Sequence, residues 1–293
     1  MRADLHVHSN ASDGTDPPAE VMRRAGRARL DAVALTDHDT VAGYAEARRG
    51  LPGSLTLVPG MELSCRLGGR SLHLLAYLFD PDDPELAAET RRIRDDRVLR
   101  ARAMVQRLAE LGVGITWDQV AAIAGRAVVG RPHIARAMAA SGAIAEPGVA
   151  FTRDWIGDGG RAYVHRYALD PTRAIRLVRA AGGVAVLAHP RPARGSELAR
   201  QGESGAGSAV SDEQIAALAA AGLAGVEVFH PDQPESERAR LLGLASDLGL
   251  EATGGSDDHG SLTGHRLGAE TTAADAYERL ISKATGAKPM RRD

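Results

Sequence analysis

The sequence has a single cysteine, Cys65, so the chain cannot form an intrachain disulfide. This cysteine usage is typical of a reducing compartment. No apolar run is long enough to cross a bilayer as a helix, and the N-terminus enters a strand-like segment without a charged-then-apolar leader. We therefore expect a cytoplasmic protein that does not bind membranes.

Aromatic residues and lysines are also scarce. Three phenylalanines, five tyrosines and two tryptophans leave the packing of the core to Ala, Val, Leu and Ile, and the hydrophobic share of 44% is enough for a substantial core. The formal net charge of -2 argues against a broad basic surface, so duplex nucleic acid is not an expected partner. The two lysines, Lys283 and Lys288, both lie near the C-terminus.

Short strand-like segments alternate with helical patterns along most of the chain, which favours a parallel sheet. Most of these segments run into His, Asp or Glu. Because polar side chains at many strand ends are typical of a (β/α) barrel, we expect a closed or nearly closed barrel rather than an open doubly wound sheet. The expected strands lie near residues 3–8, 31–36, 55–58, 71–77, 182–188, 225–229 and 251–254.

One long segment interrupts this alternation. Residues 84–165 contain a long charged helical pattern followed by shorter helices, with no strand signal. We expect this segment to be a small inserted helical domain that caps the barrel mouth. The predicted organisation is therefore a barrel formed by 1–83 and 166–285, the inserted cap 84–165, and a C-terminal tail 286–293.

Polar residues with metal-binding chemistry gather where the expected strands are. His6 and His8 project from the same side of an extended strand and can grip one metal together. The whole set exceeds what one metal needs, so we expect two or three divalent ions that share a bridging carboxylate. Mixed imidazole and carboxylate ligands favour Mn, Fe or Zn over Mg or Ca. The candidate metal ligands are His6, His8, Asp13, His38, Glu62, His73, His189, Asp257 and His259.

Six motifs, which together contain all of these residues except His73, resemble those of the PHP (polymerase and histidinol phosphatase) superfamily and occur in the family's order. The resemblance implies a distorted (β/α)7 barrel with a two- or three-metal phosphoesterase centre. The motifs are His6-Val7-His8-Ser9, Ser12-Asp13-Gly14-Thr15, Thr36-Asp37-His38-Asp39, Pro59-Gly60-Met61-Glu62, Ala188-His189-Pro190 and Gly255-Ser256-Asp257-Asp258-His259.

The resemblance also implies how the ligands are shared, with Glu62 bridging. One ion is expected on His6, His8, Glu62 and Asp257, a second on Asp13, His38 and His259, and a third on Glu62, His73 and His189. Manganese is the expected metal, with Fe and Zn as alternatives. Relatives often place a histidine in the loop where this chain has Pro231-Asp232-Gln233; whether His230 compensates for it stays open, and His230 is left out of the ligand set. The residues expected to act in catalysis are His6, His8, Asp13, Glu62 and Asp257.

The predicted cap contains candidates for substrate binding. Arg97 and Arg100 lie along one flank of the long helix, and arginine forms paired charge-assisted bonds with phosphate. His133 begins a helix after Pro132, where amide groups favour anions. These residues resemble those of a PHP branch of 3',5'-nucleoside bisphosphate phosphatases, which has 5'-to-3' oligonucleotide exonucleases among its relatives.

We therefore predict hydrolysis of a phosphomonoester on a small nucleotide of the 3',5'-bisphosphate type by a metal-bound hydroxide. A 5'-3' exonuclease on short oligonucleotides and a histidinol-phosphatase-like enzyme are the alternatives within the family. An amidohydrolase barrel also opens with His-x-His, but such enzymes commonly use a carboxylated lysine on a central strand. Lys283 and Lys288 lie too near the C-terminus for that role. A regulatory protein with a decayed metal site is disfavoured by the intact ligand set.

Overall fold

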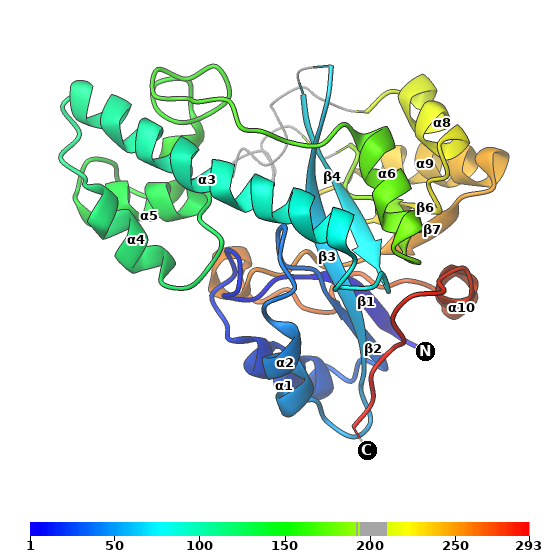
Figure 1. Cartoon of the computed structure of the whole chain (residues 1–293). Coiled ribbons are helices and arrows are strands. Elements are labelled where there is room, and N and C mark those ends of the chain that lie inside the picture. The colour runs from blue at the N-terminus through cyan, green and yellow to red at the C-terminus, as the bar shows by residue number, and fades with distance from the viewer. Residues whose placement is uncertain (69, 192, 194–209, 293) are drawn as a thin grey trace.

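The computed structural model describes residues 1–68, 70–191, 193 and 210–292. Within these residues, seven strands form one sheet in the order β1-β2-β3-β4-β5-β6-β7 (Figure 1). Its strands are β1 Ala3–Val7, β2 Ala32–Leu35, β3 Thr56–Leu67, β4 Arg70–Tyr77, β5 Val184–Leu187, β6 Gly225–Phe229 and β7 Glu251–Gly254.

The sheet is not wholly parallel, which corrects one expectation from the sequence. β1, β2 and β3 are parallel, as are β5, β6 and β7, but β4 is antiparallel to both β3 and β5. For β3 and β4 the reason is the short connection after Leu67, since a parallel crossover needs a dozen residues or more. β3 also continues past the predicted 55–58, through Glu62 and on to Leu67.

The two edge strands meet and nearly close the barrel. The amide of Asp257 donates to the carbonyl of His6 at 2.8 Å, and the amide of His8 donates to the carbonyl of Asp258 at 3.0 Å. Further along, Thr272 N donates to Ala3 O at 2.7 Å. The predicted fold class, a distorted seven-stranded barrel with α and β elements, is therefore confirmed.

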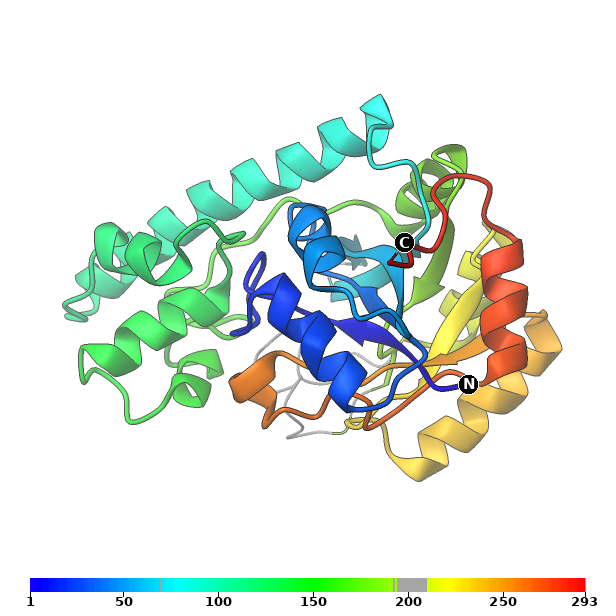
Figure 2. The same cartoon turned by 90° about the horizontal axis from the view of Figure 1, so that it is seen from below.

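Helices pack around this sheet (Figures 1 and 2). In α1, for example, Val21, Met22 and Ala25 are buried at helical spacing and pack with residues of β1 and β2. The barrel helices are α1 Pro18–Arg27, α2 Tyr44–Gly50, α6 Pro171–Ala180, α8 Asp212–Ala220, α9 Glu235–Leu248 and α10 Ala274–Ser282, with a 3-10 turn η2 at Gly260–Thr263.

The segment after β4 is helical, and its main helix α3 belongs to two hydrophobic cores. The side chains of Leu86 and Ile93 join the barrel core, whereas Met104 and Leu108 join a separate core built only from residues 98–164. Both views show α4 and α5 at the far end of α3 from the barrel (Figures 1 and 2). The elements are α3 Pro84–Glu110, α4 Trp117–Ala124, α5 Arg131–Ala140 and the 3-10 turn η1 Pro147–Phe151.

Charged residues interrupt the apolar face of α3. Its 27 residues include the buried arginines Arg97 and Arg100 as well as exposed charges.

Within the described residues, no helix is both long and apolar enough to cross a membrane.

One hydrogen bond across the barrel gives a test of its closure. Tyr77 of β4 donates its hydroxyl to the carbonyl of Leu5 in β1 at 2.7 Å, although these strands are not neighbours in the sheet. Tyr77→Phe should therefore lower the free energy of unfolding by about 1 kcal/mol, measured by urea denaturation. Tyr277→Phe is the control, because Tyr277 is also buried but its hydroxyl makes no hydrogen bond within the described residues. Equal losses in both variants would contradict this role of Tyr77.

Candidate metal centre

The nine predicted ligands converge on one buried site. All are at most 5% exposed, although they come from β1, from β3 and β4, and from the loops after β1, β2, β5 and β7. Two of them lie inside strands rather than in the loops that follow: the expected strand 71–77 already contained His73, whereas Glu62 was expected just beyond a strand that ended at residue 58. Glu62 lies inside β3 and His73 inside β4, and these antiparallel partners bring His73 Nδ1 to 2.8 Å from Glu62 Oε1.

Glu62 lies at the middle of the site. Its Oε2 is 3.2 Å from His6 Nε2, 3.0 Å from His8 Nε2 and 3.3 Å from His38 Nδ1. The other oxygen, Oε1, is 2.8 Å from His73 and 3.0 Å from His189. Both oxygens of one carboxylate therefore face histidines from four different parts of the barrel, which is the geometry a bridging ligand requires.

Three overlapping groups of side chains have ligand atoms close enough to share a metal ion. Within each group, these atoms all lie within 4.8 Å of one another. The first group equals the predicted first site, whereas His8 joins the second and His38 joins the third. The groups are His6, His8, Glu62 and Asp257; His8, Asp13, His38 and His259; and His38, Glu62 and His73. His189 adds its contact with Glu62.

Opposite charges in the site shift one another's pKa values toward the charged forms. Burial by itself raises the pKa of Glu62, but His38, His73 and His6 outweigh it and hold that pKa well below its ordinary range. Burial lowers the pKa of His8, yet Asp257 and Glu62 raise it to about 10. Since a ligating imidazole must be unprotonated, a bound cation would replace these protons.

Two buried nitrogens show that the site fits cations. His8 Nδ1 and His259 Nε2 make no hydrogen bond within the described residues. Each faces Asp13 Oδ1, at 3.7 and 3.4 Å respectively, without the geometry of a hydrogen bond. Buried polar atoms in proteins are almost always bonded. Imidazole and carboxylate ligands are also a suitable set for a divalent transition metal, so the residues present fit the implied ions.

Two aspartates flanking His38 support the site from outside. Asp37 accepts bonds from the amide of Ser9 at 2.8 Å and from the hydroxyl of Ser12 at 2.8 Å, and so holds the loop between His8 and Asp13. Asp39 accepts from the amide and hydroxyl of Ser64, at 2.8 and 2.7 Å. Asp39 has a φ of 53°, a strained value of the kind that clusters at functional sites.

The three residues predicted to bind the substrate are buried near this centre, but each has different neighbours. Arg97 donates from Nε to Asp39 at 2.9 Å and from Nη2 to Ser64 at 2.7 Å, so part of its guanidinium serves the protein itself. Arg100 donates to the carbonyl of Val164 at 2.7 Å. His133 is the third residue of α5, and its Nδ1 accepts from the amide of Gly130 at 3.0 Å. Their role in binding substrate stays a prediction.

Arg100 lies in a group of like charges. Burial, together with the positive charges of Arg131 and Arg166, lowers the pKa of Arg100 well below its ordinary value. Arg166 reaches toward the metal centre, since its Nη2 lies 2.7 Å from Ser71 Oγ and 3.3 Å from His73 Nε2. A bound anion would relieve this concentration of positive charge.

Sequence reasoning missed three residues at the site. Glu227 in β6 is fully buried against His6. His230, which was left outside the ligand set, places Nε2 3.3 Å from Asp257 Oδ2. Arg166 lies beside His73. A signal existed for Glu227, because a charge inside the apolar run 225–229 is as unusual as a histidine inside 71–77. Arg166 gave no such signal.

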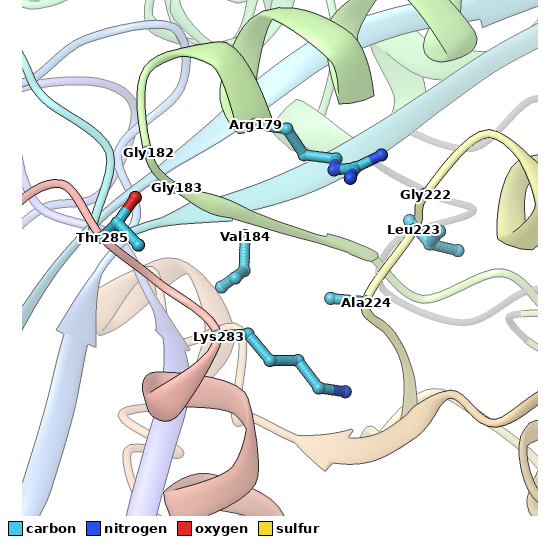
Figure 3. A pocket seen from close by; sticks show the side chains of 9 residues that line it. All are labelled: Arg179, Gly182, Gly183, Val184, Gly222, Leu223, Ala224, Lys283 and Thr285. Carbon is cyan, nitrogen blue, oxygen red and sulfur yellow. The ribbon is translucent and has the colours of Figure 1, made fainter.

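The structure has one pocket beside this centre and another on the opposite side of the barrel. A cleft of about 690 Å³ separates the β1 loop and α2 from the helical segment, and Ser12, Gly43, His133 and Arg136 are among its lining residues. The second, of about 400 Å³, includes residues 182–184 and 222–224 (Figure 3). Since these residues lead into β5 and β6, that pocket lies at the amino ends of the strands and contains none of the predicted ligands.

Comparisons with known proteins agree with this geometry. A family model described as the PHP domain matches residues 4–80. The chain is 33% identical to a 3',5'-nucleoside bisphosphate phosphatase of Chromobacterium violaceum, over 90% of this chain and 89% of that protein. It is 32% identical to a 5'-3' exoribonuclease of Haemophilus influenzae, over 87% of this chain and 89% of that protein.

A solved structure shows the same fold over nearly the whole chain. It comes from Bifidobacterium adolescentis, is described as a metal-dependent phosphoesterase, and has a TM-score of 0.86 with 34% sequence identity. The match covers 97% of this chain and 96% of that chain. Together with the PHP domain match and the two relatives, it confirms the resemblance seen in the motifs: the chain belongs to the PHP family of metal-dependent phosphoesterases.

Proposed function

We propose that the chain removes a phosphate group from a small nucleotide of the 3',5'-nucleoside bisphosphate type, with ions held by the nine predicted ligands. The observation that carries the proposal is the position of Glu62, whose two oxygens lie within 3.3 Å of nitrogens on both sides of the site. The Chromobacterium relative bears the name of this activity. The amidohydrolase alternative is not favoured, because both named relatives act on phosphoesters.

The chemistry divides between ions and protein. Divalent ions lower the pKa of bound water and offset the negative charge of a phosphoryl group. The protein positions the ligands of these ions. The loop that Asp37 holds places Asp13 beside His8, and the two oxygens of Glu62 face His6 and His73 respectively. Because these side chains are fixed before a substrate binds, the site does not have to reorganise during the reaction.

Recognition of the substrate is assigned to the helical segment 84–165, which we propose acts as a cap. Residues 98–164 of this segment have a core of their own, so this part can hold side chains in place beside the barrel. Arg100 and His133 would bind the phosphate that is not cleaved. The like charges around Arg100 support this role, because a phosphate would neutralise a guanidinium that Arg131 and Arg166 repel.

A second activity, 5'-3' exonuclease action on short oligonucleotides, uses the same centre. The name of the Haemophilus relative favours it. In that case Arg100 and His133 would bind the 5'-phosphate of the strand. The net charge of -2 keeps duplex nucleic acid outside the proposed substrates. Manganese is the proposed metal, with Fe and Zn as alternatives, and a cytoplasmic location stays a prediction.

Hydrolysis of a panel of substrates tests this function, with inorganic phosphate measured for the phosphomonoesters and released mononucleotide measured for the dinucleotide. With manganese added, adenosine 3',5'-bisphosphate should be hydrolysed faster than AMP, histidinol phosphate or a 5'-phosphorylated dinucleotide, and a chelator should abolish the activity. Preference for the dinucleotide would select the exonuclease, and preference for histidinol phosphate would contradict both nucleotide activities. No hydrolysis of any phosphoester in the panel would contradict the proposed function.

The central carboxylate gives a second test. Glu62→Gln keeps the shape of the side chain but removes the charge that two ions would share, so phosphate release should fall to the level of the chelated enzyme. Glu89→Gln is the matched control, since Glu89 is also buried but bonds to Tyr167 and Arg173 instead. Near-normal turnover in Glu62→Gln, measured at saturating manganese, would rule out a bridging role.

The cap residues should affect recognition rather than chemistry. A buried charge-assisted bond is worth about 1.5–3 kcal/mol, so Arg100→Ala should lower kcat/KM for a bisphosphate about ten- to a hundredfold. His133→Ala should act in the same direction. Hydrolysis of p-nitrophenyl phosphate, which has no second phosphate, should change little. Equal losses on both substrates in steady-state kinetics would show that these residues serve the chemistry or the fold.

A further inference from the structure

One fully buried carboxylate outside the predicted ligand set contacts two of its members. Glu227 lies in β6, and its Oε1 is 3.0 Å from His6 Nδ1. Its Oε2 accepts a hydrogen bond from the amide of His189 at 2.8 Å. The two histidines belong to different parts of the barrel, since His6 lies in β1 and His189 follows β5. Glu227 therefore fixes one by its side chain and the other by its backbone.

The contact with His6 determines which ring nitrogen carries the proton. An ionised carboxylate only accepts hydrogen bonds, so the imidazole must present a protonated Nδ1 to Glu227. In the neutral ring the lone pair then lies on Nε2. That nitrogen faces Glu62 Oε2 at 3.2 Å and Asp257 Oδ1 at 3.3 Å, in the first group of predicted ligands.

The contact with His189 stabilises a strained backbone. His189 has a φ of 25°, a value that residues with a Cβ rarely adopt. Such conformations persist where the surroundings fix them. The bond from its amide to Glu227 helps to hold this turn, and in this turn His189 Nε2 lies 3.0 Å from Glu62 Oε1.

We propose that Glu227 is a positioning residue of the metal centre, which sets the tautomer of His6 and the backbone of His189 so that both can face Glu62. The proposal rests on the proposed function only in assuming that the centre binds divalent ions. A glutamine cannot replace this carboxylate. If its oxygen accepts from His189, its amide group donates to His6 Nδ1 and moves the proton to Nε2. If the amide is turned round, it opposes the N–H of His189.

Zinc binding measured by calorimetry tests the proposal without any substrate. Glu227→Gln should weaken the affinity of at least one zinc ion about 10- to 100-fold, the usual effect of losing a partner of a metal-binding histidine. Glu251→Gln is the matched control on the neighbouring strand, because Glu251 bonds to Arg279 and Lys283 instead. The control should bind zinc as the unchanged protein does. Unchanged affinity in Glu227→Gln would overturn the proposal.

A measurement on the unchanged protein covers the case in which Glu227→Gln fails to fold. In the zinc-loaded, ¹⁵N-labelled chain, long-range proton–nitrogen correlation spectra should show the proton of His6 on Nδ1 and its Nε2 shifted by zinc. A proton on Nε2 would overturn the proposal. If zinc binds as expected but no phosphoester is hydrolysed, the proposed function fails while this role of Glu227 stands.

Discussion

The buried negative charge of Glu62 constrains the rest of this structure. A carboxylate at 1% exposure is costly unless opposite charges and hydrogen-bond donors surround it. Its partners here are five histidines, and no single strand could supply them. The sheet therefore has to curve until β1 and the loop after β5 both reach Glu62, and the antiparallel β4 has to bring His73 beside β3. The shape of the barrel and the composition of the site depend on each other.

A second electrostatic constraint links the barrel to the helical segment. Arg97 bonds to Asp39, the residue after His38, so α3 is fastened to the rim of the metal centre. Arg100, one turn further along, is held by a backbone carbonyl and repelled by neighbouring arginines. Adjacent turns of α3 thus have different roles: Arg97 attaches the helix to the barrel, and Arg100 provides positive charge that we propose binds a ligand.

The barrel class could be predicted from the sequence, and so could the nine candidate ligands that the structure places in one site. Histidines and carboxylates at or near strand ends leave a strong pattern. The sequence did not reveal that β4 runs antiparallel, since periodicity carries no strand direction, nor that β3 continues beyond residue 58 and contains Glu62. Arg166 was missed because its importance comes from contacts with Ser64, Ser71 and His73, all about a hundred residues away in the chain. Contacts at that distance leave no local pattern in the sequence.

The central claim is that Glu62 bridges metal ions in a centre of two or more. Anomalous scattering from crystals grown with manganese tests it most directly. The account predicts at least two ions at the carboxyl end of the parallel strands, with an oxygen of Glu62 in contact with two of them. A single ion bound without Glu62 would contradict the account, whatever activity the protein showed.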